Sequence, residues 1–458
     1  MDDEERTSRG QQATDYLGEL QDAGVVAVAL TFVDNSGITR VKGVPVAKLP
    51  SAAAWGVGMS PVFDGFRLDD MIVAGTYAGS PVGDLRLHPD LARLTVLAGQ
   101  PGWAWAPVDR YDQEGSAHPQ CSRLLAARLV EELADRGLTA KMAFEVEWAV
   151  SVGDGNDFVP GCQGPAYGMA RVSELSDYAV DTLAALATQG VSVDQFHPEY
   201  AAGQLEISVA AQSPVDAADT FVLVRETIRA ISLRHGLRAS FSPKVLADGV
   251  GNGAHVHLSL WSADENVMAG GNREFGLSPT GAAFSAGILD RLPALLAVGA
   301  PSVASYLRLI PSHWAGAFAC WGLENREAAL RFITGPAGNR NSSANLEVKC
   351  LDATANPYLV VAGLLAAGMA GMSEEARLPA PVPTDPASLS SEERAAAGIS
   401  ALPTSLEEAV AAFEKEPALR AAFGDELSTT IAEIRRFEQV LFADSSAEEI
   451  ATLTRWKH

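Results

Sequence analysis

Two glutamates separated by a single residue, Glu145 and Glu147, lie within the otherwise apolar segment 142–148. In a strand, residues two apart face the same side of the sheet, so both carboxylates would point in the same direction. The apolar flanks indicate an interior strand, where two neighbouring carboxylates need a cation or protons to offset their repulsion. A solvated strand face is the alternative, and this pair alone does not decide between a metal site and a plain polar surface.

Further charged residues follow at short spacings. In chain order they are His197-Pro-Glu199 with Glu206, His255-Val-His257 with Ser259, Asn325-Arg326 with Arg331, and Glu347-Val-Lys349. A site made of several glutamates and one histidine suits Mg²⁺ or Mn²⁺ better than Zn²⁺. Arginines beside such ions suit the charged oxygens of a transferring phosphoryl group, which indicates metal–nucleotide chemistry. A zinc amidohydrolase would explain the His-x-His motif, but it would leave Glu145, Glu147 and Glu206 without a role.

The elements that must position these residues are of two kinds. The range 20–107 is rich in short strands and turns, beginning with the β-rich segment Val25–Val33, and predicts a small, mostly β domain. A polar, turn-rich boundary follows it. Beyond the boundary, helical periods alternate with strands such as 139–150, which predicts an α+β protein with a second domain over 119–458. The amphipathic helices are expected over 122–137, 175–190 and 215–236.

Composition narrows the class of partner. The chain has 458 residues, of which 34 are Lys or Arg and 57 are Asp or Glu, and its net charge is −23. Such an acidic surface repels phosphate backbones and anionic lipids, so neither nucleic acid nor a membrane is an expected partner. The four cysteines lack close spacings and predict free thiols in a reducing compartment. The acidic N-terminus has no apolar signal-peptide core, and the Ala- and Gly-rich run 353–372 fits a buried helix, so a cytoplasmic protein is expected.

The order of the motifs resembles that of the glutamine synthetase superfamily. The series is Glu145-x-Glu147, His197-x-Glu199, Gly203-Gln-x-Glu206, Gly251-Asn-Gly-x-His255-x-His257-x-Ser259, Ser305-Tyr-Leu-Arg308, Asn325-Arg326, Glu347-Val-Lys349 and Ala355-Asn-Pro-Tyr358. The resemblance covers nearly the whole chain from about Val33. It implies an N-terminal β-grasp domain and a large C-terminal catalytic domain of the glutamine-synthetase/guanido-kinase type, with an antiparallel sheet flanked by helices.

The resemblance also implies a role for each matching residue. One metal ion would be held by Glu147, Glu199 and Glu206, and the other by Glu145, His255 and Glu347. The nucleotide would contact His257, Ser259, Arg326 and Arg331. Glutamate would be held by Gly251, Arg308 and Lys349. Asp64 would reach the amine pocket of the neighbouring subunit, because the family assembles into rings, commonly homo-dodecamers of two hexamers. Asp64, Arg308 and Arg326 are the expected catalytic residues.

Three departures from the family pattern bear on the substrate. Ammonia-using members carry a Glu in the loop after Arg308, where this chain has Trp314. An indole offers a flat apolar wall and a π face, which suit an alkylammonium better than ammonium. Val250 stands where Asn is usual, and Lys349 replaces an Arg, which keeps the charge but loses the bidentate fork. The Asn-Leu-Tyr adenylylation motif is absent, so control by adenylylation is not expected.

These features together predict an ATP-dependent ligase that joins the γ-carboxyl of glutamate to an organic amine through γ-glutamyl phosphate. Ethanolamine, a polyamine and an alkylamine are the candidate acceptors, and the sequence does not choose among them. An ammonia-using glutamine synthetase is the nearer alternative. A non-catalytic, nucleotide-binding regulator on the same fold is the more distant one, and the intact set of six metal-ligand candidates argues against it.

Overall fold

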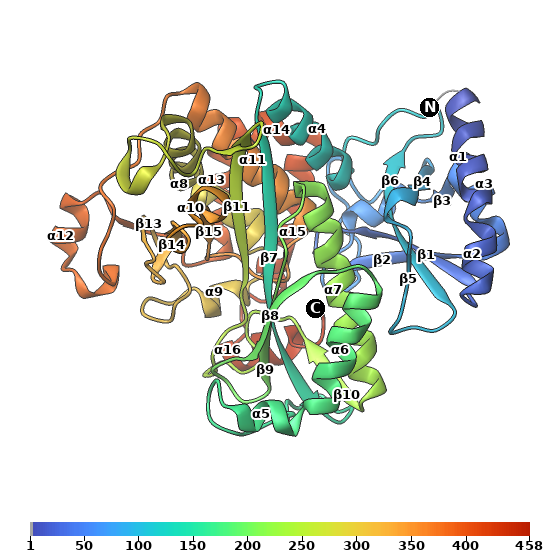
Figure 1. Ribbon diagram of the computed structural model, residues 1–458, viewed down its shortest axis with the longest axis horizontal. Coiled ribbons are helices and arrows are strands. Elements are labelled where there is room, and N and C mark those ends of the chain that lie inside the picture. Colours follow the sequence, from blue (N-terminus) through green and yellow to red (C-terminus); the bar gives the residue numbers. More distant parts are fainter. Residues whose placement is uncertain (1–2) are drawn as a thin grey trace.

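The computed structural model describes residues 3–458, in which two sheets form two units lying side by side (Figure 1). The N-terminal strands are β1 (Ala27–Val33), β2 (Thr39–Pro45), β3 (Val57–Met59), β4 (Leu85–Pro89), β5 (Thr95–Val96) and β6 (Trp103–Tyr111). They form one sheet in the order β2-β1-β6-β4-β3, with β5 also paired to β6. The core against this sheet is completed by the helices α1 (Asp3–Asp15), α2 (Leu17–Asp22) and α3 (Leu49–Trp55).

This unit is larger than the range predicted for it. Helices α1 and α2 pack onto its core before residue 20, and β6 continues past residue 107 to Tyr111. Helix α1 has the polar sequence DEERTSRGQQATD, in which Ala13 is the only apolar side chain apart from glycine and the one that is buried. Its sequence therefore carries no amphipathic signal. The β-grasp assignment stays a prediction, and the first two residues of the acidic N-terminal segment lie outside the described part of the chain.

The turn between β1 and β2 joins the two units. Asp34 Oδ1 accepts backbone N–H groups within the turn, and Gly37 has a φ of +76°. A Cβ atom on Gly37 would lie only 1.7 Å from the carbonyl oxygen of Thr354, so only glycine fits this close approach. Asn356 Nδ2 donates to the carbonyl oxygen of Val33 at 3.0 Å, and it therefore fastens the end of β1 to the larger unit.

The larger unit is built on a second sheet. Its strands are β7 (Thr139–Val152), β8 (Val193–Pro198), β9 (Gln204–Val209), β10 (Leu237–Ser240), β11 (Ala254–Ser262), β12 (Glu265–Asn266), β13 (Phe318–Leu323), β14 (Ala328–Ile333), β15 (Asn345–Val348) and β16 (Ser400–Ala401). They follow the order β16-β13-β14-β15-β11-β7-β9-β8, with β10 beside β7 and β12 beside β11. Among the described strands of this second sheet only β13 and β14 pair in parallel, so the predicted antiparallel sheet is confirmed with one exception.

Helices cover this sheet and contribute much of its core. Helices α4 (Ser122–Ala134), α6 (Ser176–Thr188) and α7 (Pro214–Arg234) lie where the amphipathic patterns predicted helices. The buried helix α11 (Pro357–Ser373) packs against α4, α7 and α8 (Pro279–Gly299). The others are α5 (Met169–Glu174), α9 (Ser305–Arg308), α10 (Arg340–Ser343), α12 (Ser391–Ala396), α13 (Leu406–Lys415), α14 (Pro417–Phe423), α15 (Asp425–Leu441) and α16 (Ala447–Thr454). Short 3₁₀ turns lie at Val46–Lys48, Pro61–Gly65, Leu91–Arg93, Glu274–Gly276 and Pro386–Ser388.

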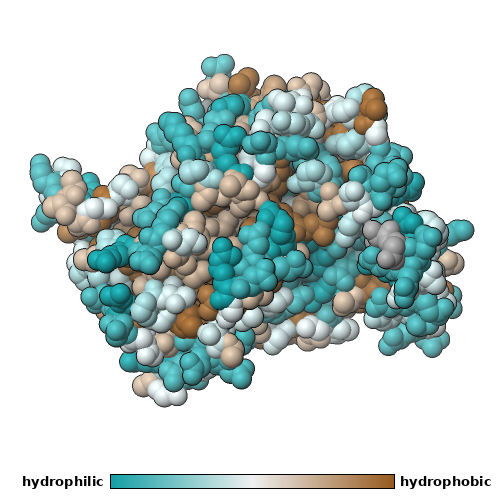
Figure 2. All heavy atoms as spheres, turned by 90° about the horizontal axis from the view of Figure 1, so that it is seen from above, coloured by the Kyte–Doolittle hydropathy of each residue, from teal (hydrophilic) through white to brown (hydrophobic). Residues whose placement is uncertain are grey.

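Hydrophilic residues cover most of the face seen in Figure 2, and the hydrophobic residues on that face form small, separate groups. Among residues 3–458, α8 is the one helix long and apolar enough to cross a bilayer, but most of it is buried inside the protein. The core helix of a globular protein meets the same criteria, so α8 is weak evidence for a membrane span. The four cysteines are free, as predicted, and all four are buried.

Candidate active site

Strand register brings the predicted acidic residues together. Glu145 on β7 lies opposite His255 on β11, and Glu147 lies opposite Glu206 on β9. On the other side of β11, Glu347 of β15 pairs with His257. Because side chains alternate across a strand, these residues share the face that carries Glu145 and Glu147. The same-face arrangement inferred for this pair is therefore the basis of the site.

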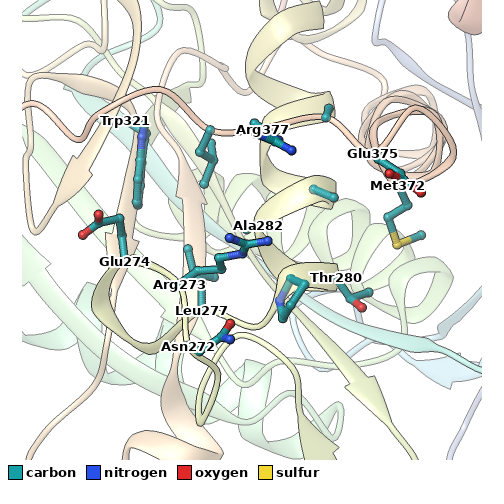
Figure 3. A pocket seen from close by; sticks show the side chains of 14 residues that line it. Asn272, Arg273, Glu274, Leu277, Thr280, Ala282, Trp321, Met372, Glu375 and Arg377 are labelled. Carbon is teal, nitrogen blue, oxygen red and sulfur yellow. The ribbon is translucent and has the colours of Figure 1, made fainter.

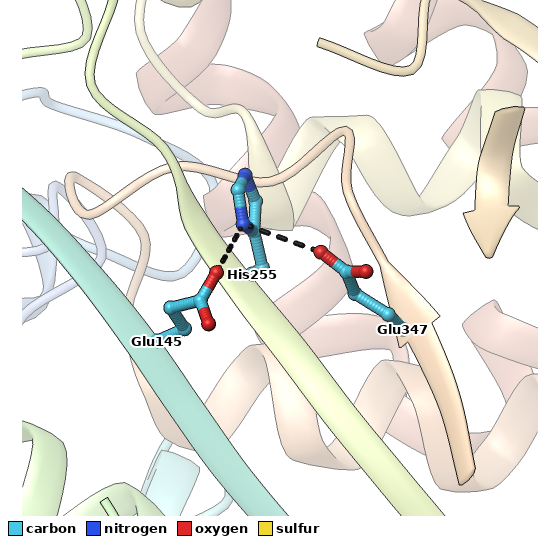
Figure 4. A group of neighbouring side chains, drawn as sticks. All are labelled: Glu145, His255 and Glu347. Atoms are coloured by element: carbon cyan, nitrogen blue, oxygen red, sulfur yellow. Dashed lines mark hydrogen bonds and ion pairs between the residues drawn. The ribbon is translucent and has the colours of Figure 1, made fainter. Parts of the chain in front are cut away.

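The first group consists of Glu145, His255 and Glu347 (Figure 4). His255 Nδ1 lies 2.9 Å from Glu145 Oε1 and 3.4 Å from Glu347 Oε1. Glu347 is 1% exposed, and it accepts hydrogen bonds from Lys349 Nζ at 3.1 Å and from Arg331 Nη1 at 2.9 Å. Although burial opposes ionisation, Lys349, the histidines and Arg331 hold the pKa of Glu347 well below its usual range. This group is balanced by fixed cations.

The second group consists of His197, Glu199 and Glu206, at the ends of β8 and β9. His197 Nε2 lies 3.0 Å from Glu206 Oε1, and its Nδ1 lies 3.6 Å from Glu199 Oε1. Burial, together with repulsion from neighbouring glutamates, raises the pKa of Glu206 to about 8. The hydrogen bond with Glu206 raises the pKa of His197 to about 9. Oxygen donors that repel one another in a partly buried place suit a divalent cation.

Glu147 lies between the two groups. Its Oε2 accepts the backbone N–H of Gly253 at 2.8 Å and a hydrogen bond from Gln204 Nε2 at 3.3 Å. Its Oε1 lies 3.7 Å from His255 Nε2. The structure thus groups His197, rather than Glu147, most closely with Glu199 and Glu206, and the assignment of Glu147 as a metal ligand stays a prediction.

The residues predicted to hold glutamate lie beside the first group. Arg308 is buried, and its guanidinium donates to the carbonyl oxygens of Leu351 at 3.1 Å and Lys349 at 3.0 Å. Its Nη2 also lies 3.4 Å from His255 Nε2. A Cβ atom on Gly251 would lie 2.6 Å from Arg308 Cγ, so glycine is needed for the loop to approach the arginine. Gly251, Arg308 and Lys349 therefore lie together at one edge of the acidic groups.

The residues predicted to contact the nucleotide are only partly brought together. His257 continues the β11 face, with Nδ1 3.0 Å from Asn345 Oδ1, and Ser259 Oγ follows it and accepts the indole N–H of Trp261 at 2.9 Å. Arg331 joins them through its ion pair with Glu347. Arg326 stands apart, because its guanidinium carbon lies 5.9 Å from the centre of the Trp314 ring and not against the acidic groups.

Asp64 does not join the site within one subunit. It is 3% exposed, its Oδ1 accepts a hydrogen bond from Arg110 Nη1, and its Oδ2 lies 2.7 Å from His118 Nε2. Although burial favours the neutral acid, Arg110 and His118 lower the pKa of Asp64. A carboxylate held in this way is a weak proton acceptor, and its predicted place in a neighbouring subunit's amine pocket stays a prediction.

Two residues beside the site were missed by the reading of the sequence. The hydroxyl of Tyr167 donates to Glu199 Oε2 at 3.0 Å, and its ring centre lies 6.2 Å from that of His197. The only signal in the sequence was a tyrosine within the Gly- and Pro-rich segment Gly164-Pro-Ala-Tyr-Gly168, and in the structure Tyr167 has a φ of +55°. Glu327 accepts the backbone N–H of Trp314 at 2.8 Å, although no motif marks Glu327.

A cavity of about 630 Å³ is separate from these acidic groups. It lies between the start of α8, the segment after α11 and Trp321 of β13 (Figure 3). Its lining includes Arg273 and Arg377 but none of the predicted site residues. The chemistry predicted from the sequence is therefore not located in this cavity.

Comparisons with known proteins agree with this geometry. Residues 119–451 match the family model described as glutamine synthetase, catalytic domain. The chain is 55% identical over 456 residues to the gamma-glutamylpolyamine synthetase GlnA3 of Streptomyces coelicolor, covering 99% of this chain and 98% of the relative. It is 30% identical over 440 residues to the glutamine synthetase of Halobacterium salinarum, covering 94% of each.

Solved structures show the same fold. The crystal structure of a glutamine synthase homologue matches with a TM-score of 0.85 and 32% identity, over 95% of this chain and 99% of that one. A GmaS/ADP complex matches with a TM-score of 0.82 and 26% identity, over 94% of this chain and 97% of that one. Shared fold, matched catalytic domain and full-length identity lead to one conclusion. The chain belongs to the glutamine synthetase family.

Proposed function

We propose that the chain ligates the γ-carboxyl group of glutamate to a polyamine. ATP-dependent ligation of glutamate to an amine is the activity of this enzyme, and the polyamine is the finer part of the proposal. The observation that carries it is the 55% identity, over nearly the whole chain, to a gamma-glutamylpolyamine synthetase, combined with the two clusters of glutamate and histidine that strand register brings together. Members of the family use ATP and divalent metal ions, and the oxygen-rich donors here favour Mg²⁺ or Mn²⁺.

The reaction needs two steps that these residues can serve. A γ-carboxylate oxygen of glutamate attacks the terminal phosphorus of ATP, which gives γ-glutamyl phosphate and ADP. The neutral amine then attacks the acyl carbon, phosphate leaves, and the amine loses a proton. Divalent ions, when bound, supply positive charge to the phosphoryl oxygens. Arg308 and Lys349 would hold the carboxylates of glutamate, and Arg326 and Arg331 would contact the phosphates.

The loop after α9 supports an organic acceptor over ammonia. Trp314 stands on this loop and is 56% exposed, so its indole is available to a substrate and is not packed into the core. Methylene groups of an amine gain about 0.8 kcal/mol each when fully buried, and ammonium has none to bury. An exposed indole beside the site therefore favours an acceptor with a hydrocarbon portion.

Assembly and location follow from the same proposal. We expect a homo-dodecamer of two hexameric rings in the cytoplasm, where ATP and glutamate are available. Several large apolar side chains on the N-terminal unit are exposed in the single subunit, which suits burial between subunits. They include Val26, Val41, Trp55 and Trp103. At a neighbour's site Asp64 would hold an ammonium group, since its lowered pKa makes it a weak base.

Phosphate release from ATP, measured with glutamate and a panel of amines, tests the proposal. The panel contains ammonium, ethanolamine, butylamine, 1,4-diaminobutane and spermidine, with omission of glutamate as the control. We expect the largest kcat/KM with a diamine or polyamine, and the γ-glutamyl product identified by mass. A preference for ammonium would instead identify an ammonia-using glutamine synthetase, and absence of turnover with every amine would identify a regulator.

A further inference from the structure

Glu327 is a buried acid that the reaction described above leaves without a role. It is 9% exposed and lies between Arg326 and the start of β14. Its Oε1 accepts the backbone N–H of Trp314 at 2.8 Å, while its Oε2 has no hydrogen-bond partner within residues 3–458. Burial and nearby Asp385 raise the pKa of Glu327 by more than the Trp314 N–H, His313 and Lys349 lower it, so a further cation beside the free oxygen would offset an unfavourable charge.

The strand places Glu327 at the edge of the active site. On β14, Arg331 points toward the site, because its Nη1 donates to Glu347 at 2.9 Å. Side chains alternate between the two faces of a strand, so Ala329 lies on the same face as Arg331, and Glu327 follows on that face just before the strand begins. Four residues of extended chain place Glu327 roughly 13 Å from Arg331. Lys349, which donates to Glu347 and whose backbone N–H donates to Ala329 O, is close enough to interact electrostatically with Glu327. Along these strands Lys349 therefore lies between Glu327 and the cluster of acidic residues that contains Glu347.

The loop above Glu327 is held in a fixed shape. Ser312 and Trp314 have positive φ values of +59° and +56°, which bulky residues adopt rarely. Ser312 Oγ donates to Asp385 Oδ2 at 2.8 Å, and Trp314 N–H donates to Glu327. These two contacts hold the backbone of Trp314 against the Glu327 carboxylate, and the exposed indole of the same residue has the guanidinium carbon of Arg326 5.9 Å from its ring centre. An exposed indole and a partly free carboxylate oxygen therefore belong to two residues that are joined by a hydrogen bond.

We propose that Glu327 binds the second ammonium group of a diamine or polyamine acceptor, while Trp314 covers its methylenes; this rests on the proposed function. The reacting nitrogen must be neutral to attack the acyl phosphate. The distal nitrogen does not react and remains an ammonium at neutral pH, so it requires an anionic partner several methylenes away. A hydrogen bond between an ammonium and a carboxylate is about twice as strong as a neutral one. Ethanolamine and alkylamines have no second ammonium and gain nothing from Glu327.

Glu327→Gln tests this assignment, because glutamine keeps an acceptor for Trp314 N–H and removes only the charge. We expect kcat/KM with 1,4-diaminobutane to fall about ten- to hundredfold, and kcat/KM with butylamine to stay within about threefold of wild type. Ser312→Ala is the matched control, since it loosens the same loop without changing charge and should affect both amines equally. Equal losses for both amines in Glu327→Gln, or no loss for either, would overturn the inference.

A measurement on the wild-type protein serves as a second test that needs no variant. We compare 1,4-diaminobutane with 4-amino-1-butanol, which has nearly the same shape but a neutral distal group. The diamine should be preferred by about tenfold or more. If both are ligated equally well, the proposed function stands and the role of Glu327 is refuted. If wild type ligates none of these amines and no other amine of the panel, spermidine included, the proposed function fails and the role of Glu327 falls with it.

Discussion

The two clusters of acidic residues in the site, one around Glu347 and the other around Glu206, differ in the cations that balance their negative charge. Glu347 lies between Arg331 and Lys349, at 2.9 and 3.1 Å. Glu199 and Glu206 have His197 as a partner, but no lysine or arginine forms an ion pair with them in the described chain. Removing repulsion among buried carboxylates is a large part of what a bound cation contributes. The second group therefore has the most to gain from a divalent ion.

Loss of a residue that only supports a metal ligand weakens metal binding roughly 10- to 100-fold. Glu206→Gln removes a predicted direct ligand, so it should weaken the binding of Mn²⁺ by more than this. It should not unfold the protein, because glutamine keeps the size of the side chain and an oxygen that can accept a hydrogen bond from His197. Calorimetric titration with Mn²⁺ gives the affinity, and thermal unfolding without metal checks the fold. Glu265→Gln, which removes a charge from an exposed acid on β12, is the control. An unchanged Mn²⁺ affinity in Glu206→Gln would contradict the metal assignment.

At the residue level, the sequence could identify side chains in motifs but not side chains that reach the site through loops. Glu145 and His255 were recognisable because strand alternation makes their spacing meaningful. Tyr167 and Glu327 were not, because Tyr167 lies in a loop with a φ of +55°, and Glu327, just before β14, contacts a loop with positive φ values at Ser312 and Trp314. Such geometry leaves no period in the sequence. Arg326 matched a motif, yet it lies by Trp314 and not by the acidic groups.

The elements that carry the site were predictable where their period was long and regular. Strand β7 and helices α4 and α7 lie within a few residues of the expected ranges, because their apolar faces are buried against one core. Helices α1 and α2 were not predicted, since they bury few residues. The parallel pairing of β13 with β14 was also unpredictable, because pairing partners are set by tertiary packing and not by the strands' own patterns.

One turn shows how strongly an element depends on a contact with the other unit. Gly37→Ala should lower the free energy of unfolding well beyond the roughly 1–2 kcal/mol that a left-handed backbone costs a non-glycine residue. The excess arises because the new methyl group would overlap Thr354 O, 1.7 Å away. Urea unfolding followed by tryptophan fluorescence measures the change.

Gly24→Ala is the matched control for this turn. Gly24 belongs to the same unit and has a φ of +73°, but a Cβ atom there would have no neighbour within 4 Å. It should therefore show only the backbone cost. If Gly37→Ala and Gly24→Ala destabilise the protein equally, the contact between the two units contributes little to stability.

At the scale of the whole molecule, the order of motifs along the chain indicated the family, and the match over residues 119–451 confirms it. The sequence could not show which side chains surround Asp64, because its partners Arg110 and His118 lie 46 and 54 residues further along the chain. Each carboxylate oxygen of Asp64 has one hydrogen-bond partner inside the subunit, Arg110 for Oδ1 and His118 for Oδ2. A carboxylate oxygen can accept more than one hydrogen bond, so a contact with a neighbouring subunit remains compatible with this arrangement.

Asp64→Asn should lower the free energy of unfolding by about 3–5 kcal/mol at pH 7, because it leaves the buried guanidinium of Arg110 without its counter-charge. Arg110 and His118 lower the pKa of Asp64 in the folded protein, so its ionised form stabilises the fold above the ordinary value of 3.8. That contribution is lost as the pH falls through the lower folded value. Urea unfolding measures the free energy of unfolding of wild type and of Asp64→Asn, and the difference between these two free energies should therefore narrow below pH 3.8.

Mixing variants separates this structural role from a role at a neighbour's site. If each site takes Asp64 from one subunit and Arg326 from the next, rings reassembled from equal amounts of Asp64→Asn and Arg326→Ala contain about a quarter of sites with both native residues. Their activity should approach a quarter of wild type, at a temperature where Asp64→Asn is folded. Wild type mixed with Arg326→Ala is the control and should retain about half. If the variant mixture is no more active than the mean of the two variants alone, Asp64 acts only within its own subunit, and its contribution is to hold Arg110 and His118 in place.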